Sequence, residues 1–322
     1  MNIKDLVRSG ILTLTGLVWI VPVAAGFQQP QKPTAQAKQT QKKTQTRKAT
    51  SKNLPPRLSP KQQLLKEARA AYYSLKTEGM KGFSCTMMPN WAALLEEPRK
   101  SDPAKIDEAI ERLKGIHFSV DVDAEGAAKV GHNEISADND AMAKGLAQVY
   151  SGMEQMTSGF FQTWAVFVIH PALPEQGTDF DLETSPLQYH LAYKEGGTKA
   201  PAEVEKPAGT EAAPAVAPEP ATAIDVAMSR LYVINSVRVV ADKFTSTIKP
   251  QFVKTRKGFL LTGYDAEYQG ATGSDRTELH VNMENQSVSG LQVPKKLALK
   301  GMYNGSPFAV EVVFSGCTAT LQ

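Results

Sequence analysis

Large apolar residues recur every three or four positions between about residues 138 and 168, which is the longest periodic pattern in the chain. At 100° per residue these positions fall on one stripe of a helix. The stripe is rich in methionine and aromatic side chains, among them Met153, Met156, Phe160, Phe161 and Trp164. These five are the candidate lining of a hydrophobic ligand site, because methionine-rich faces repack around varied apolar partners. The alternative is that the stripe belongs to an ordinary packed core.

Three glycines, Gly145, Gly152 and Gly159, lie seven residues apart along one edge of this stripe. A glycine inside a helix costs about 1 kcal/mol relative to alanine. Their spacing therefore predicts that a neighbouring backbone approaches the helix closely along that edge.

Shorter helical patterns precede the long one. Ser59-Pro60 has the residue types of an N-cap and a first helical position, and the apolar face that follows runs to a stop at Gly79. Further helices are predicted from residue 90 to 97 and after Asp102-Pro103.

Alternation with period two marks much of the remaining chain. Residues 118–123 predict the first strand of a hairpin, and strand patterns dominate the C-terminal half. Turns are expected at 270–273, at Glu284-Asn285 and at Asn304-Gly305, the last being typical of a type I′ hairpin. Because the apolar face of such a meander needs a cover, we expect an α+β fold. Its curved antiparallel sheet, an incomplete barrel of about 8–11 strands, should wrap around helices that include the long one near 138–168.

Composition divides the chain into parts. Residues 1–25 join a basic start to an apolar run that ends in small residues, the pattern of a cleaved secretory signal peptide, with an uncleaved N-terminal anchor as the alternative. Residues 26–58 contain eight Lys/Arg and no acid, which predicts a disordered basic tail. The net charge of the whole chain is +3, of which residues 1–25 contribute +1 and the tail +8, so the body that follows carries −6. The tail is either a solvated spacer or an arm that binds an anionic membrane or cell-wall surface.

Residues 59–322 are predicted to form a single domain. Within it, residues 196–222 consist mainly of Ala, Pro, Glu, Gly and Thr. This composition is typical of a flexible insertion at a hairpin tip, and an interdomain linker is the alternative.

The chain has two cysteines, Cys85 and Cys317, and neither follows the predicted cleavage site. We therefore expect no lipid attached through cysteine, and a mature protein that is soluble in the periplasm. In an exported protein an even pair is a candidate disulfide. Two separate buried thiols are the alternative.

Motifs for catalysis are missing from the sequence. There is no Gly-x-Ser-x-Gly, no His-Glu-x-x-His and no phosphate loop, and the five histidines lack metal-ligand spacing. Ser246-Thr-Ile-Lys249 matches Ser-x-x-Lys in spacing but lies in a strand pattern. The acidic clusters 121–125 and 179–181 suit solvated turns better than a cation site. We therefore predict no catalytic residue, no metal, no cofactor and no nucleic-acid partner, and the sequence defines no oligomeric state.

The C-terminal strand patterns carry a resemblance. The run from Gly258-Phe-Leu-Leu through Gly290-Leu-Gln-Val-Pro294 to the alternating segment 308–314, together with an export signal and an N-terminal helix, resembles the LolA/LolB/LppX-like superfamily. The resemblance implies an incomplete barrel around a helical plug and a non-catalytic carrier of lipoprotein acyl chains or other lipids. It assigns no ligand residue to this chain.

Three functions follow as hypotheses. The first is an exported binding protein that carries lipid or lipoprotein acyl chains in a hydrophobic cavity near the outer membrane. The second is an envelope structural or adaptor protein that binds other proteins without a lipid ligand. The third, a hydrolase with a site assembled from distant residues, has no titratable cluster in the sequence to support it.

Overall fold

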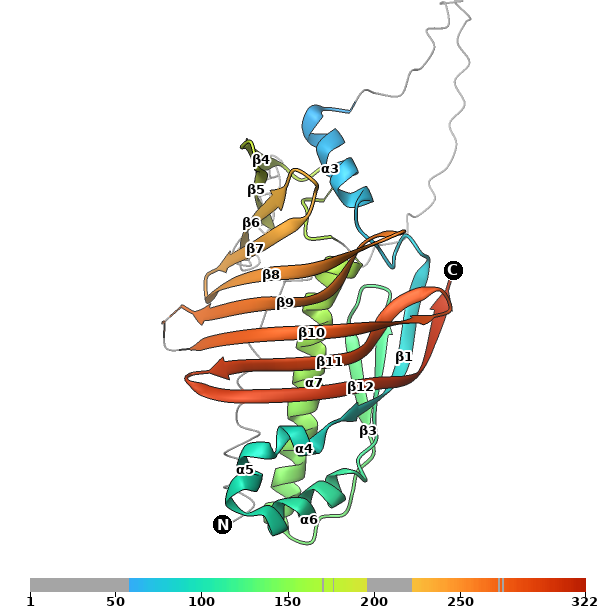
Figure 1. Cartoon of the computed structure of the whole chain (residues 1–322), viewed down its shortest axis with the longest axis vertical. Helices are drawn as coiled ribbons and strands as arrows, with labels where there is room; N and C mark the ends of the chain where they lie inside the picture. The colour runs from blue at the N-terminus through green and yellow to red at the C-terminus, as the bar shows by residue number, and fades with distance from the viewer. Residues whose placement is uncertain (1–57, 170, 176, 196–221, 272, 274) are drawn as a thin grey trace, which may run out of the picture.

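The computed structural model describes residues 58–169, 171–175, 177–195, 222–271, 273 and 275–322. In these residues twelve strands form one antiparallel sheet, and five helices accompany it (Figure 1). The helices are α3 (Pro60–Ala70), α4 (Trp91–Leu94), α5 (Glu96–Ser101), α6 (Pro103–Leu113) and α7 (Asp140–Val168). The strands are β1 (Met80–Pro89), β2 (Phe118–Asp123), β3 (Ala128–His132), β4 (Phe180–Thr184), β5 (Gln188–Glu195), β6 (Thr222–Ser229), β7 (Ile234–Ala241), β8 (Phe244–Thr255), β9 (Gly258–Gly270), β10 (Arg276–Val288), β11 (Leu291–Tyr303) and β12 (Ser306–Leu321).

The strand order is β3-β2-β1-β12-β11-β10-β9-β8-β7-β6-β5-β4. Every neighbouring pair is consecutive in sequence except β1 and β12, which join the first strand to the last. The sheet therefore remains open, with β3 and β4 at its two edges. The expected α+β class with an antiparallel sheet is confirmed, and the strand number lies just above the expected range.

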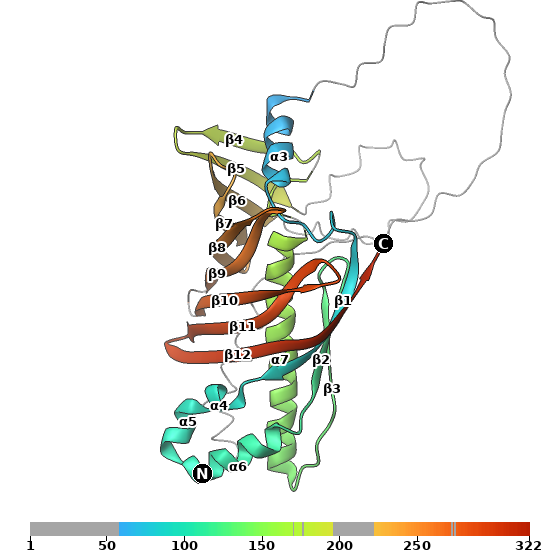
Figure 2. The same ribbon diagram turned by 45° about the vertical axis from the view of Figure 1, so that its right-hand side comes forward.

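The sheet curves around α7, which crosses the strands on the concave side (Figures 1 and 2). The long helix predicted near 138–168 is confirmed. Asn139 caps it, because its side-chain oxygen accepts a hydrogen bond from the Met142 backbone N–H at 3.0 Å. Within the described residues, no helix combines the length and the hydropathy that crossing a membrane requires.

The first helix is shorter than its apolar pattern predicted. It begins as expected, with a capping box between Ser59 and Gln62. It ends at Ala70 instead of Gly79, because β9 captures the backbone that follows: Phe259 N–H donates to Ala71 O at 2.8 Å. Gly258 permits this approach, since a Cβ there would lie 2.6 Å from the Tyr72 carbonyl carbon.

Two of the three expected turns are confirmed. Between β9 and β10 the Gly273 N–H donates to the Gly270 carbonyl at 2.9 Å, and Asn304-Gly305 connects β11 to β12 with positive φ at both residues. The turn expected at Glu284-Asn285 is wrong, because these residues lie inside β10, where the register against β11 shifts. The chain instead reverses at Ser289-Gly290, whose φ values are 52° and 84°. Two consecutive polar residues at a β-bulge thus have the same sequence pattern as a turn.

The close approach predicted for the α7 glycines is wrong at Gly159, where a Cβ would meet no described atom within 4 Å. Gly145 and Gly152 are buried. The predicted signal peptide (1–25), almost all of the basic tail (26–58) and the insertion (196–222) lie outside the described residues. The exceptions are Leu58 and Thr222, the latter being the first residue of β6.

Candidate functional site

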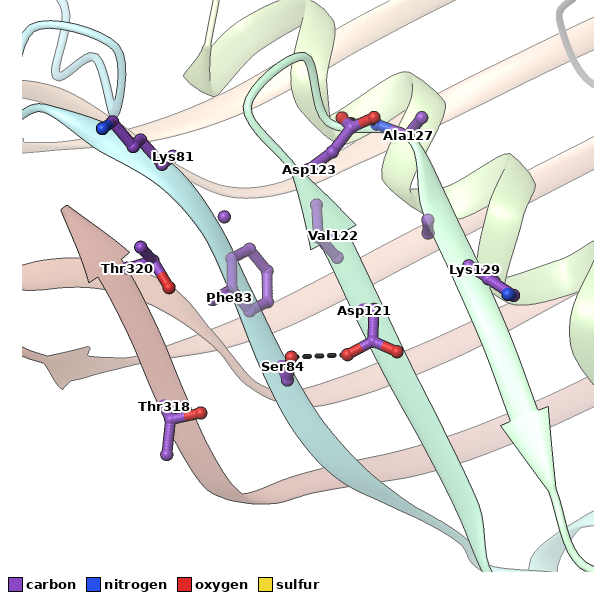
Figure 3. A pocket seen from close by; sticks show the side chains of 12 residues that line it. Lys81, Phe83, Ser84, Asp121, Val122, Asp123, Ala127, Lys129, Thr318 and Thr320 are labelled. Atoms are coloured by element: carbon purple, nitrogen blue, oxygen red, sulfur yellow. Dashed lines mark hydrogen bonds between the residues drawn. The ribbon is translucent and has the colours of Figure 1, made fainter. Parts of the chain in front are cut away.

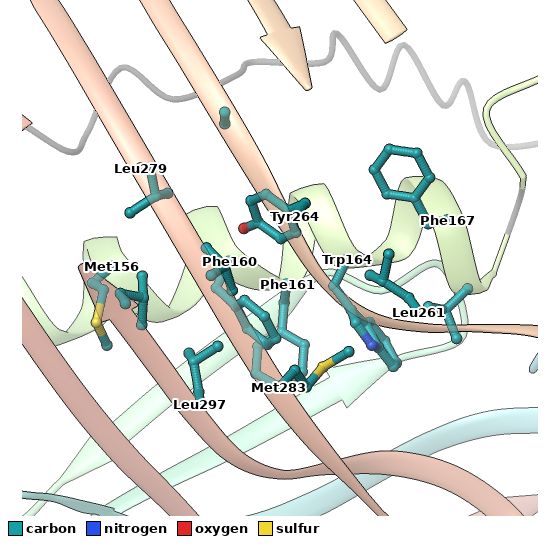
Figure 4. Close-up of a cluster of buried hydrophobic side chains, with 14 of the residues drawn as sticks. Met156, Phe160, Phe161, Trp164, Phe167, Leu261, Tyr264, Leu279, Met283 and Leu297 are labelled. Atoms are coloured by element: carbon teal, nitrogen blue, oxygen red, sulfur yellow. The ribbon is translucent and has the colours of Figure 1, made fainter. Parts of the chain in front are cut away.

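The five residues predicted to line a hydrophobic site all project from α7 into the interior (Figure 4). Met153, Phe161 and Trp164 are fully buried, and Met156 and Phe160 are each 3% exposed. Opposite them lie buried side chains from β9, β10 and β11: Leu261, Tyr264, Leu279, Met283 and Leu297. The structure therefore brings the predicted residues together in one tightly packed apolar layer.

Phe161 lies at the centre of this layer. Its ring meets Phe160, Trp164, Phe314 and Phe83 edge-on, with centroid separations of 4.9, 5.5, 5.8 and 5.9 Å. Phe83 belongs to β1 and Phe314 to β12, so this one side chain contacts both strands of the pair that joins the first strand in sequence to the last. Each edge-on pair adds roughly 0.5–1.5 kcal/mol beyond the area it buries.

A few polar groups enter this apolar layer with partners. The Tyr264 hydroxyl shares a hydrogen bond with Thr163 on α7, and burial raises the pKa of Tyr264 far above its ordinary value. The Thr163 hydroxyl also donates to the Gly159 carbonyl at 3.1 Å. Nearby, the Thr157 hydroxyl donates to Met87 Sδ at 3.3 Å. Burial therefore favours the neutral form of the Tyr264 phenol.

Other buried polar atoms have no hydrogen-bond partner in the structure. Among the described residues they are Gln155 Oε1, Trp164 Nε1, Ser246 Oγ and Asn285 Oδ1. A buried polar atom without a partner costs free energy, about 1–3 kcal/mol. Periodicity placed Trp164 inward but carries no information about what its indole N–H would face, so sequence reasoning missed this feature.

The predicted disulfide is confirmed: Cys85 in β1 is bonded to Cys317 in β12, with an S–S distance of 2.07 Å. It lies where the register between the two strands shifts, between Ser84 and Thr86. Gln286 donates to Cys317 Sγ at 3.3 Å from the neighbouring part of the sheet. The bond therefore fastens the one strand pair that is not consecutive in sequence.

A pocket of about 460 Å³ lies over β12, β1, β2 and β3, among exposed polar side chains that include Lys81, Lys129 and Thr318 (Figure 3). Its two aspartates serve the local structure. Asp121 accepts a hydrogen bond from Ser84, and Asp123 Oδ1 accepts from the backbone N–H groups of the β2–β3 turn. The described residues hold no cluster of metal-ligating side chains.

The Ser-x-x-Lys spacing does not form a site. Ser246 is fully buried in β8, whereas Lys249 is exposed and forms an ion pair with Glu267 at 3.5 Å. Three residues along a strand place the two side chains on opposite faces of the sheet. A serine that cannot reach its lysine is not activated as a nucleophile.

Two hairpin turns carry the most exposed large apolar side chains of the described residues. Leu187, between β4 and β5, is 82% exposed, and Leu231, between β6 and β7, is 77% exposed. Arg230 N–H donates to the Leu187 carbonyl at 3.3 Å and thereby joins the two turns. We call Leu187 and Leu231 the apolar tip.

Tyr232 fixes the shape of the second turn. It adopts φ = 64°, an uncommon conformation for a bulky residue. Its hydroxyl donates to Glu67 Oε2 of α3 at 2.6 Å, and its carbonyl accepts from the Tyr72 hydroxyl at 2.6 Å. The hydrogen bond to Glu67 raises the pKa of Tyr232 to about 12. Tyr189 stacks on Tyr232, and the Arg230 guanidinium lies 4.4 Å from the centre of the Tyr189 ring.

Comparison with known proteins assigns no relative to this arrangement: no protein-family model, no curated protein and no solved structure matches the chain.

Proposed function

We propose that this chain is an exported, non-catalytic protein of the periplasm that carries lipid or lipoprotein acyl chains between α7 and the concave face of its sheet, in the manner of the LolA-like carriers. The observation that carries the proposal is the contact between α7 and the sheet. One helix covers this part of the concave face, and it does so with methionine and aromatic side chains. Such side chains can exchange their contacts for those of a bound chain.

The energetic balance favours uptake of a long chain over a short one. Each methylene transferred from water to an apolar site contributes about 0.8 kcal/mol, so a sixteen-carbon chain contributes roughly 12 kcal/mol. That gain is opposed by the displacement of buried side chains, each worth about 1.5–3 kcal/mol. A ligand that replaces several side chains of the stripe, among them Met153 and Met156, can therefore still bind. Because the five stripe residues are packed in the core and do not line a cavity in this structure, the proposal requires that this is the unloaded protein and that a ligand displaces them on entry.

The open sheet supports this proposal. Because β3 and β4 are both edges, the sheet can widen around a ligand without breaking any strand pair. The proposed periplasmic location agrees with a disulfide, which persists in oxidising compartments.

Quenching by brominated acyl chains tests the proposal at the level of one residue. The W19F/W91F variant keeps Trp164 as its single tryptophan, and W19F/W164F keeps Trp91. Trp91 packs on Phe118, and Phe118 packs on Tyr150 of α7. Tyr150 precedes Trp164 by fourteen residues on this helix, which corresponds to about 21 Å along the helix axis. Brominated palmitate should quench Trp164 and leave Trp91 unchanged. Equal quenching of both, or of neither, would contradict carriage between α7 and the sheet.

The apolar tip favours a second candidate function, an envelope adaptor that binds other proteins without lipid. Two leucines held at the surface by Tyr232 and Arg230 form a small hydrophobic contact of the kind that partner proteins cover. In that case the purified protein should contain no lipid by native mass spectrometry. A cross-linked partner captured by the unmodified chain should then be lost from the L187S/L231S variant. It should also be lost when residues 26–58 are deleted, if the basic tail contributes to docking.

A further inference from the structure

The indole N–H of Trp164 is a hydrogen-bond donor that has no acceptor among the described residues. Its side chain is fully buried. An indole N–H can only donate, and when buried it usually has a partner. A donor left unpaired in an apolar interior destabilises the folded protein unless a bound molecule supplies the acceptor.

The surroundings of the indole ring explain why no partner is present. Phe83 and Phe161 contact it edge-on, with centroid separations of 6.0 and 5.5 Å. Leu261 and Met283 belong to the same buried cluster (Figure 4). The side chains of these neighbours carry no oxygen or nitrogen atom, so none of them can accept the hydrogen bond of the indole N–H.

Asn285 supplies a second unpaired atom beside this cluster. Its Nδ2 donates to the Leu261 carbonyl at 2.9 Å, which fixes the orientation of the amide, while its buried Oδ1 has no partner. The β10 bulge at Glu284-Asn285 accounts for this placement, because a bulge re-aims the side chain beside it. Leu261 thus contacts Asn285 directly and shares a cluster with Trp164.

We propose that a bound acyl chain is recognised through its carbonyl group, whose oxygen accepts the hydrogen bond of Trp164 Nε1. This inference rests on the proposed function and names its ligand class: acyl esters and acyl amides, as opposed to plain hydrocarbons and alkyl ethers. The carbonyl restores the missing acceptor, whereas a methylene or an ether group in the same position leaves the donor poorly satisfied. A site that hydrogen-bonds its ligand rejects the analogue without that group.

Three chain-matched ligands test the proposal on protein expressed from the full chain: monopalmitoyl glycerol, N-palmitoyl serinol and hexadecyl glycerol ether. Dissociation constants are measured by displacement of a fluorescent fatty acid. The unmodified protein should bind the ester or the amide about threefold to tenfold more tightly than the ether. Which of the two binds more tightly identifies the acyl linkage. In W164F, which keeps a large ring but has no N–H, ether binding should stay within about twofold and the preference should vanish. W91F, the matched control, should keep it.

Three results would overturn the inference. If the unmodified protein binds all three ligands equally, acyl-chain carriage stands and carbonyl recognition is wrong. If W164F keeps the preference, another group supplies the donor. If no ligand binds, the proposed function fails and this inference fails with it. Should W164F not fold, nuclear magnetic resonance of ¹⁵N-indole-labelled protein decides: the Trp164 indole proton should shift downfield with the ester and not with the ether.

Discussion

Breaking the bond between Cys85 and Cys317 should lower the free energy of unfolding by about 5 kcal/mol. The two cysteines are 232 residues apart, so the bond closes most of the chain into one loop. In the chain-entropy description, closing a loop of that length removes about 18 cal/mol/K from the unfolded state, or about 5 kcal/mol at 25 °C. For a domain of this size each kcal/mol corresponds to about 2–4 °C, so Tm should fall by about 10–20 °C.

Two ways of removing the bond separate its covalent effect from the packing of the sulfurs. Reduction leaves both sulfur atoms in place, whereas C85A/C317A also removes atoms at Cys85, which is 4% exposed. Urea unfolding of the oxidised, the reduced and the doubly substituted protein should give midpoints that fall in that order. The m-value should rise when the bond is absent, because the unfolded chain expands and exposes more surface.

The reasoning would be refuted if the oxidised and reduced forms differed by less than about 1 kcal/mol. That result would mean that the ladder between β1 and β12 already holds the sheet together without a covalent bond. It would also mean that the unfolded chain keeps these two segments close to each other.

Three further predictions concern single side chains. G301A should destabilise the folded protein by at least about 1–3 kcal/mol, because its Cβ would lie 2.2 Å from a carbonyl oxygen of β10. G159A places its Cβ in open space and should stabilise the folded protein by up to about 1 kcal/mol. Thermal unfolding of both variants checks this pair. F161A should cost about 3–5 kcal/mol in urea unfolding, because it removes the ring at the centre of the α7 layer. E67Q should lower the pKa of Tyr232 from about 12 toward 10 in a spectrophotometric titration. In the unmodified protein, the contribution of the Tyr232–Glu67 hydrogen bond to the free energy of unfolding should be lost as pH rises from about 10 through 12, because the raised pKa stabilises the folded protein only while the phenol is neutral.

Local signals in the sequence were enough to predict most helix starts and one tight turn. Ser59 and Asp102 each accept a backbone N–H at a predicted helix start, and Asn304-Gly305 has the positive φ values of its predicted turn. These features depend on neighbours within four residues. A sequence pattern records such neighbours directly, which is why they could be predicted.

The errors arose where a distant segment decides the local structure. The first helix ends at Ala70 because β9 binds the following backbone, and the polar pair Glu284-Asn285 stays in a strand because β11 continues beside it. Neither partner is visible from the local sequence. The α7 stripe was predicted as an inward face, but its dense packing depends on large side chains such as Met283 and Leu297 that arrive from strands more than a hundred residues later.

On the proposed function, α7 would have to admit an acyl chain while it stays attached to the rest of the protein. Toward its start, the Tyr150 hydroxyl accepts a hydrogen bond from Ile135 N–H at 3.2 Å, and at its end the Val168 carbonyl accepts from Leu75 N–H at 2.9 Å. Between these two bonds the helix meets the sheet mainly through apolar side chains such as Phe161, together with the hydrogen bonds of Thr157 to Met87 and of Thr163 to Tyr264. Apolar contacts have no directional requirement, so the methylenes of a ligand can replace them one by one, whereas breaking a buried hydrogen bond carries a fixed cost. If the proposed function is right, uptake should therefore bow the middle of α7, near Phe160, away from the sheet while both attached regions stay in place.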